Sequence, residues 1–145
     1  SAFRRQTQIM ARYRMNDLLR LSKGPCRCGS PLRTVDEIVG RMDDVFRLVS
    51  MHGPILVTPD ILRNAVLGAD RRIDDFRLIQ TAADRVELRL APGLANDAAE
   101  AAVEAVRALL AARQAIVAVE LVRAPLPLET GRKLRRVECR LGAGP

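Results

Sequence analysis

The order of strand-like and helix-like segments after residue 44 is the feature that most constrains how this chain folds. Alternating apolar patterns predict strands at 44–50, 75–81, 85–91 and 116–122 and a closing strand at 133–141, with helices at 58–68 and 96–113 between them. Thr58 and Pro59 are typical of a helix start, and Gly68 is typical of a helix end. The resulting β-α-β-β-α-β order predicts an α+β, ferredoxin-like (split βαβ) fold, with both helices on one face of a mainly antiparallel sheet.

Charge and aromatic content bear on which partners the chain can have. Its 145 residues suffice for one domain, or for a small domain that carries a piece of another, and its 48% of apolar residues suffice for a core. The formal net charge of +7 comes from arginines that are scattered among acidic residues, and only 3% of the residues are aromatic. Polyanion binding favours clustered basic residues and base stacking needs aromatic side chains, so we expect no nucleic-acid partner.

Cysteine use and hydropathy indicate a reduced, cytoplasmic setting and no membrane partner. Three cysteines cannot all pair with one another, and the chain has neither a secretory apolar segment nor a run of about 18 apolar residues. The sequence begins at Ser1 with neither an initiator methionine nor a helix cap. We therefore expect it to be a fragment of a longer protein.

Three polar spots could carry chemistry. Asp17 follows a run that contains arginine and tyrosine, Arg41 and Asp43 lie in a Gly-Arg-x-Asp-Asp run that predicts an exposed bend, and Arg132 and Lys133 follow a glycine in a loop. An aspartate for sugar hydroxyls, an arginine for anionic oxygens and a mobile lysine for phosphate charge would together suit a nucleotide. Each spot also has an ordinary explanation, as a charged turn or a solvated loop.

Cys26 and Cys28 lie one residue apart before a glycine, a spacing that suits half of a zinc site or a redox-active turn. Structural zinc takes four ligands, and Cys139 and His52 are the other soft candidates in this sequence. Three interpretations stay open: a complete local site, a half-site that ligands from outside this sequence complete, and two cysteines that merely form a tight turn.

Taken in order along the chain, these spots resemble the end of an acyl-adenylate-forming enzyme, the superfamily of acyl-coenzyme A synthetases, peptide-synthetase adenylation domains and luciferases. Residues 13–17 (Tyr-Arg-Met-Asn-Asp) are similar to the family's Tyr-Arg-Thr-Gly-Asp, residues 40–44 to its Gly-Arg-x-Asp-Asp hinge, and residues 127–136 to its Pro-x-x-x-x-Gly-Lys-x-x-Arg motif. The Gly-Pro-Cys-Arg-Cys-Gly-Ser run at 24–30 resembles the phenylacetate–coenzyme A ligase branch and the coenzyme F synthetase-like proteins. In some of these, Cys-x-Cys helps bind structural zinc.

The resemblance implies a division of the chain into three parts. Residues 1–39 would be a short, β-rich remnant at the C-terminal end of a large adenylation domain, residues 40–44 a hinge, and residues 45–145 a mobile C-terminal lid. Asp43 would be the point about which the lid turns between its two positions. The rest of the adenylation domain would then be the principal partner of this chain.

The resemblance also implies a reaction and residues that carry it. Asp17 would hold the ribose of ATP or AMP, Arg41 would contact the nucleotide, and Lys133 or Arg132 would be the catalytic cation. The implied reaction is the activation of a small carboxylic acid by ATP with Mg, followed by transfer of the acyl group to coenzyme A or another thiol. The fragment alone would be inactive. The Cys-x-Cys run would supply a partial structural zinc site.

Two departures from the family pattern bear on these expectations. Counted from Gly131, the lysine position of the last motif falls on Arg132, and Lys133 lies one place later. Residues 51–54 (Met-His-Gly-Pro) replace the glycine-led turn that lines the family's pantetheine tunnel, so the thiol acceptor stays open. The alternative is a stand-alone regulatory or assembly module of ferredoxin-like fold, without catalysis, that binds a small ligand at the sheet-edge interface of a homodimer.

Overall fold

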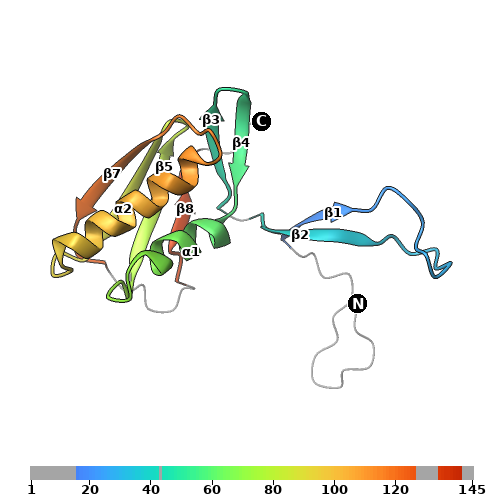
Figure 1. The fold of residues 1–145 in the computed structure, drawn as a ribbon, viewed down its shortest axis with the longest axis horizontal. Coiled ribbons are helices and arrows are strands. Elements are labelled where there is room, and N and C mark those ends of the chain that lie inside the picture. The colour runs from blue at the N-terminus through green and yellow to red at the C-terminus, as the bar shows by residue number, and fades with distance from the viewer. Residues whose placement is uncertain (1–15, 43, 127–133, 142–145) are drawn as a thin grey trace, which may run out of the picture. The chain divides into compact units, whose positions relative to one another are not determined.

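The chain falls into two compact units, residues 1–42 and 43–145, in a computed structural model that describes residues 16–42, 44–126 and 134–141 (Figure 1). At positions 39–41 the description covers the backbone alone. The boundary between the units lies within the predicted hinge at 40–44, whose movement stays a prediction.

The described part of the first unit is a two-stranded antiparallel ribbon. Strand β1 (Asp17–Leu21) pairs with strand β2 (Val35–Arg41), and the Ser22 N–H donates to the Thr34 carbonyl at 2.9 Å beyond the last ladder pair. A ribbon of two strands buries little apolar surface and is marginally stable on its own. In keeping with this, Ile38 in β2 is 72% exposed.

The described part of the second unit is a mixed α+β structure in which two helices cover one face of a four-stranded sheet (Figure 1). The sheet has the order β7-β6-β5-β8. Strands β5 and β6 are antiparallel, whereas β7 runs parallel to β6 and β8 runs parallel to β5. The bounds of the elements are β3 (Phe46–Ser50), β4 (Gly53–Val57), α1 (Pro59–Ala69), β5 (Phe76–Ala82), β6 (Arg85–Leu90), α2 (Asn96–Ala111), β7 (Ala118–Arg123) and β8 (Val137–Cys139).

Both predicted helices are present, with small shifts at their ends. Helix α1 begins at Pro59 directly after Thr58, as predicted, but it continues through Gly68. Helix α2 includes Asn96, and Ala95 occupies the cap position without a side-chain hydrogen bond. Within the described residues, no helix is both long enough and apolar enough to cross a membrane.

The ferredoxin-like strand order is not what the structure shows. In a split βαβ fold the strand predicted at 44–50 would lie inside the main sheet, but here it is β3 and pairs with β4 in a separate hairpin. Here β6 pairs directly with β7, and β8 lies at the other edge of the sheet beside β5. The reason is local, because Met51 and His52 form a two-residue turn after which Gly53, with a φ of 111°, starts a return strand. The sequence pattern indicated only a turn there and did not predict β4.

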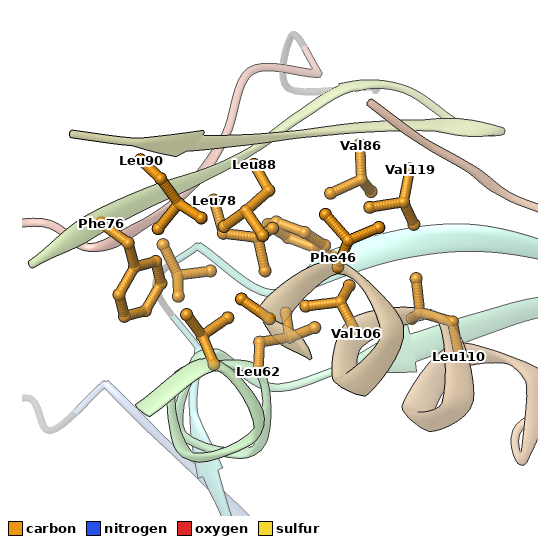
Figure 2. Close-up of a cluster of buried hydrophobic side chains, with 14 of the residues drawn as sticks. Phe46, Leu62, Phe76, Leu78, Val86, Leu88, Leu90, Val106, Leu110 and Val119 are labelled. Atoms are coloured by element: carbon orange, nitrogen blue, oxygen red, sulfur yellow. The ribbon is translucent and has the colours of Figure 1, made fainter. Parts of the chain in front are cut away.

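The hydrophobic core of the second unit lies between the helices and the sheet (Figure 2). Phe46 from β3 and Phe76 from β5 are fully buried in it, and so are Leu62 from α1 and Val106 from α2. The other labelled members of this cluster come from the sheet and from α2, namely Leu78, Val86, Leu88, Leu90, Leu110 and Val119. Because Phe46 belongs to the hairpin, the hairpin and the four-stranded sheet share one core.

Candidate functional site

Two of the predicted nucleotide-binding residues lie opposite one another in the first unit. Asp17 at the start of β1 is the ladder partner of Arg41 at the end of β2, although the two are far apart in the sequence. The Met42 N–H donates to the Asn16 carbonyl at 2.7 Å and continues the pairing beyond them. Residues directly opposite in an antiparallel ladder are the closest cross-strand neighbours, so the ribbon brings the backbones of these two predicted residues together.

The other residues predicted to act on the nucleotide lie outside the described part of the chain. These are Asp43, Arg132 and Lys133, and the side chain of Arg41 is outside it as well. Their roles as hinge, catalytic cation and nucleotide contact stay predictions. The structure does describe the residues that flank them, including Asp44 and Leu134.

Asp44, for which the sequence predicted no role of its own, connects the predicted bend with the segment after the predicted cationic loop. Its Oδ1 accepts a hydrogen bond from the Cys139 N–H at 3.3 Å, and its Oδ2 lies 3.9 Å from the Arg135 Nε. Only 16% of the Asp44 side chain is exposed. A signal was present, because Asp44 and Arg135 each lie in one of the family-like motifs, but a motif does not say which of its residues contact each other.

Cys26 and Cys28 lie in a tight turn of the first unit. The Gly29 N–H donates to the Cys26 carbonyl at 3.0 Å, and Gly29 has a φ of 79°, which favours glycine. Both thiols are free, and their Sγ atoms lie 3.0 Å apart. The hydrogen bond between the two side chains lowers the pKa of the Cys28 thiol below its ordinary value. The turn therefore presents an exposed thiol of increased acidity next to a second sulfur.

For a metal ion, this turn offers two sulfur ligands. Two thiolates on one tetrahedral zinc, each at about 2.3 Å, would have sulfurs about 3.8 Å apart, so the Cys26 and Cys28 side chains would have to open slightly. Among the residues that the structure describes, no group of three or more His, Cys, Asp or Glu could hold a metal ion. The turn thus fits half of a structural zinc site, and the described residues do not supply the other half.

In the second unit, two surface hollows of ligand size stand out. None of the described residues that were predicted for the site lines either of them. One of about 680 Å³ lies where β6 and β7 end and α2 begins, and Arg72 lies on its rim. The Arg72 guanidinium is already held by Asp70 at 2.7 Å and by Asp97 at 2.8 Å. The other hollow, of about 510 Å³, lies between α2 and β7 and carries Glu100 and Glu104. Arg107 also lines this second hollow, where its guanidinium donates to the Val119 carbonyl at 3.4 Å beside the two glutamates.

The sheet face opposite the helices carries paired charges. Arg77 lies opposite Arg89 in the ladder, and Glu87 lies opposite Glu120. Arg77 in β5 pairs with Asp75, which directly precedes that strand, at 2.8 Å, and Arg89 pairs with Glu87 within β6. Because acidic and basic side chains alternate and pair, this face offers no continuous basic surface for a phosphate backbone. This arrangement favours the expectation of no nucleic-acid partner, which stays a prediction.

Comparison with known proteins gives a coarse likeness to solved structures. No family model matches this chain, and no curated protein matches it. Among solved structures, the chain is similar to an open conformation of 2-hydroxyisobutyryl-CoA ligase in complex with 2-HIB-AMP and CoA, with 24% sequence identity and a TM-score of 0.47. The similarity covers 84% of this chain and 27% of that chain, so the present sequence spans about a quarter of the length of that ligase.

Proposed function

We propose that the chain is the C-terminal portion of an acyl-adenylate-forming ligase, of the phenylacetate–coenzyme A ligase or coenzyme F synthetase-like branch. Residues 1–39 would belong to the large domain, residues 40–44 would form the hinge, and residues 45–145 would form the mobile lid. The observation that carries the proposal is the pairing of Asp17 with Arg41, which joins two family-like motifs at one end of the ribbon. The unit boundary at residues 42 and 43 supports the proposed hinge.

In the proposed first step, the carboxylate of a small acid attacks the α-phosphorus of ATP, and acyl-AMP forms as pyrophosphate leaves. The Asp17 carboxylate would accept hydrogen bonds from the ribose hydroxyls, and Arg41 would contact anionic oxygens of the nucleotide. Lys133 or Arg132 would stabilise the charge that develops at the α-phosphate, and a bound Mg ion would neutralise phosphate charge. In the second step, the sulfur of coenzyme A or another thiol attacks the acyl carbonyl carbon, and AMP leaves.

The apolar side of the ribbon supports a partner domain. Leu19 lies opposite Ile38, and Leu21 lies opposite Val35, so that these four apolar residues share one face. They are between 36% and 72% exposed. We propose that the large adenylation domain covers these four residues. The alternative is that a second copy of the chain covers them in a homodimer. A cytoplasmic location is part of the proposal, because a reducing compartment keeps cysteines free.

Pyrophosphate release tests the proposal. The 145-residue chain alone should release no pyrophosphate from ATP with any acid, whereas the intact enzyme should do so with its own acid. Release by the isolated chain would refute its assignment as an inactive portion. A panel of carboxylic acids assayed with the intact enzyme would identify the substrate. No release with any acid would favour the stand-alone module.

Two alanine variants of the intact enzyme identify the catalytic cation. Either Lys133→Ala or Arg132→Ala should slow acyl-AMP formation by about 10²–10³-fold, the usual cost of losing one group that stabilises developing charge. Lys23→Ala is the matched control, because Lys23 is the other lysine of the sequence and lies exposed in a turn. If neither variant is slower than the Lys23→Ala control, the cationic role is wrong.

A further inference from the structure

We propose that Asp44 is a positioning residue, which holds the segment that follows the predicted cationic loop against the C-terminal end of the predicted hinge at residues 40–44. The inference rests on the proposed function, because it concerns how a lid would carry its cationic loop. It gives a role to a carboxylate that the family resemblance leaves without one. The described residues that carry it are Asp44, Arg135 and Cys139, all within the second unit.

The first contact caps the open edge of the last strand. The Arg140 N–H donates to the Gln80 carbonyl at 3.0 Å, so Arg140 faces β5. Backbone N–H groups of successive strand residues point in opposite directions, and the Cys139 N–H therefore points away from β5. There the Asp44 Oδ1 accepts its hydrogen bond at 3.3 Å. Asp44 thus substitutes for a neighbouring strand at the point where β8 would otherwise lack one.

The second contact involves the residue that leads from the predicted loop into β8. The Arg135 Nε lies 3.9 Å from the Asp44 Oδ2, which is beyond hydrogen-bond distance but within reach of an ion pair. The Arg135 side chain is 69% exposed, so solvent weakens this attraction. The hydrogen bond between the Cys139 N–H and Asp44 therefore holds the two segments together more strongly than the ion pair does. The attraction to Arg135 favours one orientation of the Asp44 carboxylate.

The backbone of Asp44 explains why an aspartate suits this position. Its φ of 58° lies in the left-handed region, where aspartate and asparagine are tolerated better than most residues with a β-carbon. A residue at this point must adopt that conformation and also present an acceptor to Cys139. Asparagine tolerates the left-handed backbone and supplies an acceptor, whereas glycine tolerates the backbone but supplies no acceptor. Of the three, aspartate alone also carries a negative charge that attracts Arg135. The three side chains therefore separate the backbone, hydrogen-bond and charge contributions.

Amide hydrogen exchange on the ¹⁵N-labelled 145-residue chain tests the contacts. In Asp44→Gly, the Cys139 amide should exchange about tenfold faster or more, because its acceptor is gone, whereas in Asp44→Asn the rate should stay within about twofold of wild type. The Arg135→Gln variant should leave the Cys139 amide protected, because the hydrogen bond from that amide to Asp44 does not involve Arg135. Asp84→Asn, in an exposed turn of the same unit, is the matched control. An unchanged Cys139 amide in Asp44→Gly would overturn the proposal.

Half-reaction rates in the intact enzyme separate positioning from mere stabilisation. Asp44→Gly should slow acyl-AMP formation and Asp44→Asn should restore it, in step with Cys139 protection. Wild-type rates in a folded Asp44→Gly enzyme would overturn the positioning role while leaving the proposed function intact. Absence of pyrophosphate release from the wild-type enzyme would instead refute the proposed function itself, whatever the exchange rates at Cys139.

Discussion

The side-chain amide of Gln80 is hydrogen-bonded to both backbone polar groups of Arg47. Its Oε1 accepts from the Arg47 N–H at 2.8 Å, and its Nε2 donates to the Arg47 carbonyl at 2.6 Å and to the Ala82 carbonyl at 3.1 Å. Gln80 lies fully buried on β5, and Arg47 lies on β3. The Gln80 amide thus pairs with the Arg47 backbone as a residue of a neighbouring strand would, and it joins the hairpin to the four-stranded sheet.

Replacing Gln80 by leucine should lower the free energy of unfolding by roughly 2–3 kcal/mol, because it leaves two backbone groups of Arg47 without their partner. Chemical denaturation monitored by circular dichroism would measure the change. Thr81→Ala is the control, since Thr81 is the next residue of the same strand and is exposed. Equal effects of the two substitutions would show that the amide contributes nothing specific.

Truncation of Phe46 should be among the most costly single changes in the second unit. Phe46→Ala removes a fully buried ring from a core that the hairpin shares with the sheet, and the expected cost is about 3–5 kcal/mol. Leu56→Ala on the partner strand is the control, because Leu56 is 63% exposed. The hairpin and the sheet should unfold in one transition. Separate transitions in the wild-type protein would contradict a shared core.

Acid should destabilise the protein partly through Asp70. The hydrogen bond from the Arg72 side chain lowers the pKa of Asp70 from 3.8 to about 2. A carboxyl group with a lowered pKa in the folded state contributes stability that is fully present above its unfolded pKa and is lost as the pH falls through the folded value. The melting temperature should therefore decline between about pH 4 and pH 2, and Asp70→Asn should decline less steeply there. In Asp84→Asn, the melting temperature should decline with falling pH as steeply as in the wild type. An equally shallow decline in both variants would show that the effect is not specific to Asp70.

Cys28 should react with iodoacetamide before Cys139 does. Its thiol is exposed and its pKa is lowered by the hydrogen bond from Cys26, and the thiolate is the reacting form. Cys139 is half-buried. Cys26→Ala should slow the reaction of Cys28 because it removes the hydrogen bond, whereas Cys26→Ser keeps a donor and should slow it less. Peptide mapping by mass spectrometry measures each rate. Equal rates in the alanine and serine variants would rule out this hydrogen bond as the cause.

Proline at position 43 should impair the lid of the intact enzyme. Proline holds φ near about −65° and would restrict the bend that the proposed function requires. Rates of acyl-AMP formation and of thiol transfer should be measured separately for Asp43→Pro. Asp43→Ala is the control, because it removes the carboxylate and leaves the backbone free to turn. Unchanged rates of both half-reactions in the proline variant would count against a hinge at this residue.

The elements with strong local signals could be predicted from the sequence. Thr58 and Pro59 mark the start of α1, and the β5–β6 hairpin follows from two alternating runs joined at residues 82–84. Strand β4 was missed because Gly53 and Pro54 are typical of turns, and proline is tolerated in β4 since β3 is its one described partner strand. The wrong sheet order has the same origin, because an unexpected return strand kept β3 out of the main sheet.

The sequence predicted which residues belong to the candidate site but not which of them lie next to one another. Asp17 and Arg41 came from separate motifs, and nothing in the sequence indicated that a ladder would place them opposite one another. The contact between Asp44 and Cys139 spans 95 positions, and it depends on which edge of β8 stays open. Such relationships arise from sheet order, which is the property that local patterns describe least well.

The ladder between β1 and β2 also affects how distant relatives of this chain should be sought. Pairing fixes the separation of Asp17 and Arg41 in space, while residues 23–33 between Ser22 and Thr34 form a tip whose length does not enter that separation. Insertions or deletions in the tip would leave the two residues facing each other. A search that demands a constant gap between the two motifs would therefore discard homologues with a longer or shorter tip, and one that allows a variable gap would recover them.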